Sequence, residues 1–119
     1  KNFLLNKIKD PTEYEKILFS AQYSPFWTRV MGHLSTNLPK NSKECEKFVN
    51  PVLNYYKIGK IFIGHSPTLI QNLGINSTCD ESVYRVDTGF AQTFDKYRKT
   101  TYTLQVLEIL NDNEINIIV

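Results

Sequence analysis

The apolar residues of this chain follow helical spacing in its first half and strand-like runs in its second half. Between residues 10 and 21 they recur at steps of three and four, at Tyr14, Ile17, Leu18 and Ala21. Asp10 can cap this predicted helix, Pro11 suits its first position, and Glu13 completes a pair similar to a capping box. The first predicted element is therefore an amphipathic helix.

A second helix is predicted to begin with Asn41 or Ser42 as its cap. Its apolar face repeats the helical steps at Cys45, Phe48, Val49, Val52, Leu53 and Tyr56. Pro51 lies on the other face and removes one backbone hydrogen bond, so we expect a kink that costs about 3 kcal/mol unless packing compensates. Gly59 is placed to end this helix.

The remaining apolar runs predict strands at residues 61–63, 75–79, 83–87, 102–110 and 115–119. The first is expected to be buried. Asp80 and Glu81 predict one turn and residues 111–113 another, and residues 89–99 are expected to form a loop. Helices followed by strands favour an α/β fold, with these strands in one sheet of a two-sheet sandwich and a helix outside. That sheet would have an unpaired face or edge, which invites association with another chain.

Size and charge limit the classes of partner. At 119 residues the chain has room for one small domain, and 41% hydrophobic content is ordinary for a globular protein. A net charge of +2 gives no strong electrostatic case for binding nucleic acid or an anionic membrane. No apolar run approaches the ~20 residues needed to span a bilayer. We therefore expect neither nucleic acid nor a membrane as a partner.

The two cysteines, Cys45 and Cys79, do not define a disulfide framework. Cys45 falls on the apolar face of the second predicted helix, where a buried free thiol is expected. Sparse cysteine favours a reducing, intracellular compartment.

The predicted strand at residues 61–63 ends abruptly in Gly64 and His65. Ligands of α/β sheets bind at the carboxyl ends of strands, where side chains face solvent. A neutral imidazole at such a position can bind a divalent metal ion. The alternative is a loop histidine that only hydrogen-bonds its neighbours.

Two further residues carry candidate chemistry. The guanidinium of Arg29 matches two phosphate oxygens in a planar, bidentate way. The alternative is a surface arginine beside a core tryptophan, Trp27. Asp87 either lies near a metal or caps backbone amides in an Asp-Thr-Gly turn, and the turn is favoured.

Several segments together resemble the C-terminal half of a calcineurin-like metallophosphoesterase, most closely the Shewanella-like and lambda-type phosphoprotein phosphatases. Residues 24–29 resemble the Trp-x-Arg segment of those enzymes, and residues 61–68 resemble their strand ending in Gly-His-Thr-Pro. Residues 75–80 and 83–89 resemble the next strands, which end in Asp-x-Gly, and residues 104–109 resemble the last strand. The order and spacing of these segments, over roughly residues 20 to 110, are more specific than any single motif.

The resemblance implies a hydrolase of phosphomonoesters, on phosphorylated proteins or small phosphoesters, with two divalent ions of Mn, Fe or Zn. It implies that His65 holds one metal ion and that Arg29 binds the substrate phosphate. Asp87 is then a candidate for a group just behind the metal ligands. Pro67 stands where the wider superfamily has a second histidine, which fits the phosphoprotein phosphatase branch.

The other metal-binding motifs of that family do not occur in residues 1–119: Asp-x-His, Gly-Asp-x-x-Asp-Arg-Gly, Gly-Asn-His-Glu and His-Gly-Gly. We therefore expect residues 1–119 to be the C-terminal part of one metallophosphoesterase domain. Without the N-terminal half or another chain to complete the site, this chain alone is expected to be inactive and to hold no catalytic residue of its own. The alternative is a catalytically inactive phosphatase-like module with a structural or assembly role.

Overall fold

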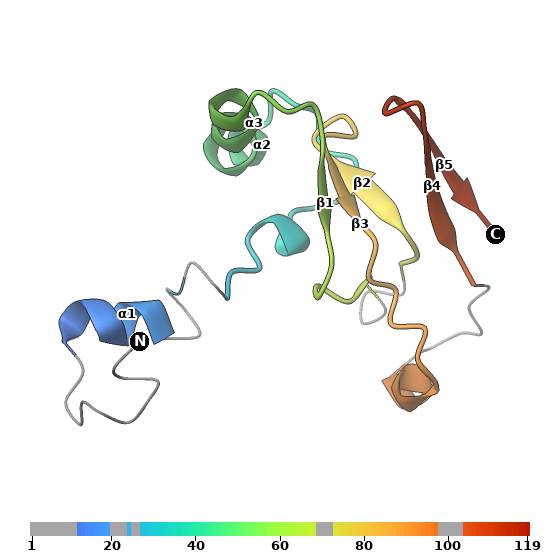
Figure 1. Ribbon diagram of the computed structural model, residues 1–119, viewed down its shortest axis with the longest axis horizontal. Helices are drawn as coiled ribbons and strands as arrows, with labels where there is room; N and C mark the ends of the chain where they lie inside the picture. The colour runs from blue at the N-terminus through green and yellow to red at the C-terminus, as the bar shows by residue number, and fades with distance from the viewer. Residues whose placement is uncertain (1–11, 20–23, 25–26, 69–72, 98–103) are drawn as a thin grey trace.

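The computed structural model describes residues 12–19, 24, 27–68, 73–97 and 104–119 and shows a mixed α/β chain (Figure 1). The helical elements of these ranges are α1 (Glu13–Phe19), α2 (Lys43–Phe48), α3 (Asn50–Tyr56) and the 3-10 helices η1 (Met31–His33) and η3 (Gln92–Tyr97). The strands are β1 (Ile61–Ile63), β2 (Asn76–Thr78), β3 (Val83–Arg85), β4 (Val106–Leu110) and β5 (Glu114–Ile118). The predicted α/β class is confirmed, and each predicted strand has a counterpart: β1 matches its prediction, β5 is shifted by one residue, and β2, β3 and β4 are shorter than predicted.

Strand β3 is the centre of a three-stranded sheet with the order β1-β3-β2. It pairs parallel with β1 and antiparallel with β2. A turn at residues 79–81 joins β2 to β3, as expected, and all three of its residues have positive φ. Strands β4 and β5 form a separate antiparallel hairpin (Figure 1). The predicted strands are therefore divided between two small sheets.

The expected kink in the second helix is confirmed as a break between α2 and α3. Ser42 caps α2, since its hydroxyl accepts a hydrogen bond from the Cys45 N–H at 3.2 Å. Pro51 lies in the first turn of α3. A backbone N–H at this position has no acceptor within the helix, so the missing N–H of proline costs α3 no hydrogen bond. The expectation for Gly59 is wrong, because α3 ends at Tyr56 and Lys57 takes the left-handed conformation with φ of 53°.

Helix α1 begins with a capping box formed by Thr12 and Glu15. The Thr12 N–H donates to Glu15 Oε2 at 2.8 Å, and the Glu15 N–H donates to Thr12 Oγ1 at 3.3 Å. The expected cap residue Asp10, with Pro11 and Ala21, lies outside the described residues. Tyr14 is 81% exposed, so the expected apolar face of this helix begins at the surface.

The hydrophobic core lies between the α2–α3 helices and the sheet. Its fully or nearly buried residues are Cys45, Val49, Leu53, Cys79 and Val83. Cys45 and Cys79 form a disulfide with a Cα–Cα distance of 5.7 Å. The expected free thiol at Cys45 is therefore wrong, because the buried face of α2 meets the end of β2 across 34 residues of sequence. The argument from sparse cysteine to a reducing compartment loses its basis.

A large apolar cleft separates the hairpin from the three-stranded sheet. It has a volume of about 690 Å³ and is lined from the sheet side by Phe62, Ile75 and Val86 and from the hairpin side by residues that include Val106 and Leu107. Phe62 is 40% exposed and its neighbours Ile61 and Ile63 are half-buried, so the expectation that the strand at residues 61–63 is buried is wrong. Among the described residues, a polar contact links the two sides, from the Ile75 N–H to Gln105 Oε1 at 2.7 Å.

Part of the loop expected at residues 89–99 is helical. Residues 92–97 form the 3-10 helix η3, whereas residues 98–99 lie outside the described ranges. None of the helices in the described ranges is long and apolar enough to cross a membrane.

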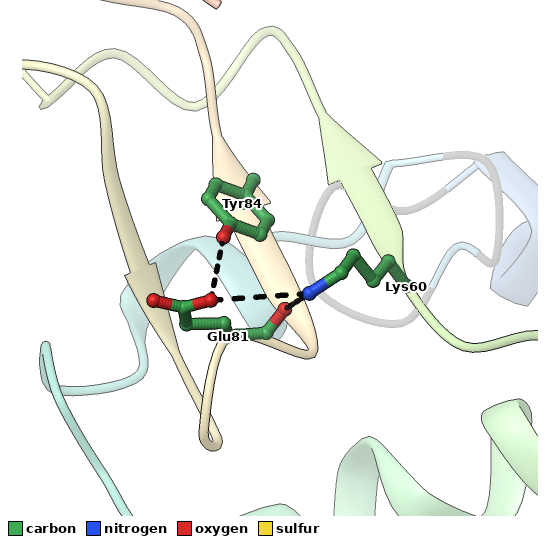
Figure 2. A network of polar contacts seen from close by, with 3 residues as sticks. All are labelled: Lys60, Glu81 and Tyr84. Carbon is green, nitrogen blue, oxygen red and sulfur yellow. Dashed lines mark hydrogen bonds and ion pairs between the residues drawn. The ribbon is translucent and has the colours of Figure 1, made fainter. Parts of the chain in front are cut away.

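The turn between β2 and β3 is closed by a small polar network (Figure 2). Tyr84, which is 4% exposed, donates from its hydroxyl to Glu81 Oε2 at 3.1 Å. Lys60 Nζ donates to the Glu81 carbonyl at 3.2 Å and lies 4.0 Å from its carboxylate. Burial, followed by the hydrogen bond and the negative charge of Glu81, raises the pKa of Tyr84 to about 12.

Loss of the disulfide is expected to destabilise the fold. Its 34-residue loop corresponds to about 3–4 kcal/mol of unfolding free energy in the chain-entropy account. Urea unfolding of the 119-residue chain should show this loss for the Cys45→Ser/Cys79→Ser variant and for the parent chain with reductant. Reductant should leave the double variant unchanged. Two reactive thiols in the unreduced, unfolded parent chain would contradict the pairing.

The phenol of Tyr84 is expected to ionise above the ordinary pKa of a tyrosine, in a late step that the phenolate absorbance can follow. Because its folded pKa lies above the ordinary value of 10, the neutral phenol contributes stability below pH 10. That contribution should be lost as pH rises from 10 to about 12. Glu81→Gln should lower the pKa of Tyr84 only in part, because burial, the largest cause of the shift, remains after the charge is removed, and Tyr84→Phe should remove the late step. An unchanged late step in Tyr84→Phe would assign it to another residue.

Candidate functional site

His65 lies at the carboxyl end of β1, one residue beyond the Gly64 that follows the strand. Its side chain is exposed, and its φ of 52° is in the left-handed region. For a residue with a Cβ this conformation costs about 1–2 kcal/mol, so the surrounding contacts must hold it. Within the described part of the chain, no hydrogen bond is made to the imidazole nitrogens.

Arg29 contacts His65 although 36 residues separate them in the sequence. Its Nη1 donates a hydrogen bond to the His65 carbonyl. Trp27 joins both residues: its ring lies 5.3 Å from the Arg29 guanidinium carbon and 5.2 Å, edge to face, from the His65 ring. We call these three residues the Trp27–Arg29–His65 cluster. The two residues that the sequence singled out for phosphate and metal binding therefore lie together.

Trp27 does not fit the alternative of a core tryptophan beside a surface arginine. Its indole is 49% exposed. It flanks the guanidinium and the imidazole at the surface, where a cation–π contact and an edge-to-face contact fix their relative orientation.

The 3-10 helix η1 begins two residues after Arg29, beyond Val30, and is packed against the loop after β1. The His33 N–H donates to the Arg29 carbonyl at 3.0 Å, which closes this turn. A Cβ placed on Gly32 would lie 2.7 Å from Ser66 Cβ, closer than side chains approach one another. The position therefore requires glycine, and it brings Arg29 and the His65 loop together.

Asp87 forms the turn that the sequence favoured. Its Oδ1 accepts a hydrogen bond from the Gly89 N–H at 3.1 Å. Its carbonyl accepts from the Thr68 N–H at 2.9 Å, and so ties the loop that carries His65 to the end of β3. These contacts give Asp87 a structural role in shaping the loop.

Arg85 is the residue of this region that sequence reasoning missed. It lies in β3 with only 1% of its surface exposed, and burial lowers the pKa of its guanidinium. Its Nη1 donates to the carbonyls of Leu34 and, at 3.5 Å, Gly32, while its Nε donates to Asn76 Oδ1 at 2.7 Å. An arginine inside a short, otherwise buried strand was the signal that could have indicated it.

A smaller pocket of about 270 Å³ opens beside the cluster. It is lined by residues of the η1 segment and the β1 loop, among them Thr28, Met31, Gly64 and Ser66. Neither Arg29 nor His65 lines this pocket, which contributes Thr28 and Ser66 as hydroxyl-bearing residues next to the guanidinium and imidazole of the cluster. Such a set can bind an oxyanion and supply one ligand to a metal ion.

A complete metal site is not formed by the residues described. Among them, no group of three or more His, Cys, Asp or Glu side chains is arranged to hold a metal ion. His65 alone has the side-chain chemistry and the position for this role at the cluster.

Comparison with known proteins gives one informative relationship. The chain is 39% identical over 127 residues to a protein of Acanthamoeba polyphaga mimivirus that is described as uncharacterized. The alignment covers 99% of this chain and 50% of the relative, so the chain spans about half the length of that protein. No protein-family model matches the sequence, and no solved structure matches it.

Proposed function

We propose that this chain is the C-terminal part of a metal-dependent phosphatase that hydrolyses phosphomonoesters of proteins or small molecules. The observation that carries the proposal is the contact between Arg29 and His65. These residues come from separate segments, each of which resembles a different motif of the phosphoprotein phosphatases. Their meeting at the carboxyl end of a strand is the arrangement that a phosphate site beside a metal ion needs.

Arg29 is the proposed phosphate-binding residue. Its Nη1 is engaged with the His65 carbonyl, and the contact with Trp27 restrains the plane of the guanidinium. The remaining donors can bind two oxygens of a phosphoryl group, with a charge that persists as negative charge develops in the transition state. Restraint of the guanidinium before substrate binds reduces the entropy lost on binding.

His65 is the proposed metal ligand, and its exposed imidazole without a hydrogen-bond partner among the described residues fits that role. Two divalent ions of Mn, Fe or Zn, when bound, would supply an activated water and neutralise phosphoryl charge. One histidine is too few for such a centre, and the described residues form no larger group of ligands, so we propose that the other ligands come from outside this chain.

The apolar cleft between the sheet and the hairpin supports the same conclusion. Its residues Phe62 and Val106 are substantially exposed, and the cleft of about 690 Å³ is large enough to receive side chains of another sheet. We propose that a preceding half of the polypeptide, or another chain, fills this cleft and supplies the missing ligands. The relative, which is twice the length of the aligned region, is consistent with that arrangement.

The alternative is a phosphatase-like module without catalysis, used in an assembly. The exposed apolar cleft also favours association in that case. The coding sequence upstream of Lys1 separates the two proposals. Asp-x-His and Gly-Asp-x-x-Asp motifs there would support the enzyme, and an unrelated sequence would support the assembly role.

Substitutions of His65 and Arg29 in the complete protein are expected to affect metal content and phosphatase kinetics differently. His65→Ala should reduce bound metal from about two ions to about one and depress turnover at all substrate concentrations. Arg29→Ala should keep the metal content while KM rises and kcat falls by roughly 100-fold. Arg29→Lys should recover only part of the loss, because a point charge replaces the bidentate fork.

The measurements are metal analysis and steady-state hydrolysis of p-nitrophenyl phosphate with added manganese. The 119-residue chain alone serves as the control and should show no manganese-dependent turnover. Full metal content and full activity in His65→Ala would exclude it as a ligand. Robust turnover by the 119-residue chain would overturn the need for another half.

A further inference from the structure

We propose that Arg85 is a positioning residue that holds Arg29 beside His65 by fixing η1, an inference that rests on the proposed function of that site. The hydrogen bonds of Arg85 in the described ranges go to Asn76, Gly32 and Leu34 and not to either residue of the pair. Its guanidinium instead binds the backbone of the turn that follows Arg29.

The burial of Arg85 is costly and needs an explanation. Its side chain is 1% exposed, and no carboxylate pairs with it in the described ranges. Its Nη2 is buried without a hydrogen-bond partner there. A buried charge without a countercharge destabilises a fold, and an apolar residue of similar volume would pack at lower cost. The guanidinium therefore contributes something other than core packing.

The guanidinium of Arg85 links the η1 segment to strand β2. Nη1 donates to the carbonyls of Gly32 and Leu34, which belong to η1 and the residue after it. Nε donates to Asn76 of strand β2, which keeps the side chain in one orientation. Because the His33 N–H also bonds the Arg29 carbonyl, the turn that Arg85 holds is the turn that begins at Arg29.

The residues that follow Arg85 hold the opposite side of the cluster. The Val86 N–H donates to the Ile63 carbonyl at 3.1 Å, and the Asp87 carbonyl accepts from the Thr68 N–H at 2.9 Å. These bonds bracket the loop that carries His65. Three consecutive residues at the end of β3 thus hold the phosphate-binding side and the metal-binding side in one frame.

A double-mutant cycle in the complete protein tests this role. Arg85→Lys keeps a positive charge but loses the fork that reaches two carbonyls and Asn76. It should lower kcat/KM by roughly 10- to 100-fold, as expected for a displaced binding group, with bound metal unchanged. In an Arg29→Ala background, Arg85→Lys should cost less than about twofold, because the residue through which it acts is already absent. Multiplicative effects of the two substitutions would overturn the proposal.

Thr78→Val is the matched control. Thr78 is also buried, and its hydroxyl donates to the Ser35 carbonyl at 2.6 Å, just beyond the part of the segment that Arg85 holds. Its loss should lower stability without changing kcat/KM. An equal loss of kcat/KM in Thr78→Val would show that Arg85 acts only through general stability.

A second readout does not depend on catalysis. The 119-residue chain contains one tryptophan, so the indole N–H of Trp27 gives one resonance in a nitrogen-15 NMR spectrum. Arg85→Lys and Gly32→Ala should both move or broaden it, because each displaces η1, whereas Thr78→Val should not. An unmoved indole resonance in Arg85→Lys would overturn the positioning role. A moved resonance with no phosphatase activity in the complete protein would sustain the positioning role and overturn the proposed function instead.

Discussion

Strand β3 is the element that joins the two segments carrying Arg29 and His65. It pairs with β1 on one side and β2 on the other, and its last residue directs a guanidinium into the η1 segment. The backbone just beyond it bonds the residues that flank the His65 loop. Because a strand held on both edges has little freedom to move, the segments bound to it inherit a fixed geometry. A site built from Arg29 and His65, which are far apart in the sequence, depends on such a common support.

The core and the candidate site meet at η1 and at the end of β1. Met31 of η1 and Ile63 of β1 pack against the buried core residues, and Phe48 of α2 lines the pocket beside the cluster. The side chain of His65 is exposed, and its left-handed backbone is held by local contacts and by the hydrogen bond from Arg29. The core can thus support the site while the exposed side chains remain available for ligands.

Sequence reasoning predicted local features well because they depend on local chemistry. The Ser42 cap, the break near Pro51 and the turn at Asp80 and Glu81 all follow from the preferences of a few neighbouring residues. The association of Arg29 with His65 could be anticipated only through resemblance to a family, since no spacing rule joins residues 36 positions apart. The α/β class could therefore be predicted from the sequence. The division of the strands between a three-stranded sheet and a separate hairpin could not.

The errors have a common physical origin in tertiary contacts. The Cys45–Cys79 bond depends on where α2 meets the sheet, which a count of two cysteines does not reveal. The exposed side chain of Phe62 depends on what covers that face, and the strand pattern alone suggested burial. Arg85 was overlooked because its partners are backbone carbonyls of a distant segment, and backbone groups carry no sequence signature.

The central claim is that the Trp27–Arg29–His65 cluster forms one side of a metal and phosphate site. Anomalous diffraction at the manganese absorption edge, from crystals of the complete protein grown with manganese and phosphate, tests it most directly. The account predicts a manganese peak at bonding distance from an imidazole nitrogen of His65, with a phosphate oxygen hydrogen-bonded to the Arg29 guanidinium. Manganese bound only at sites remote from His65, with no phosphate at Arg29, would contradict it.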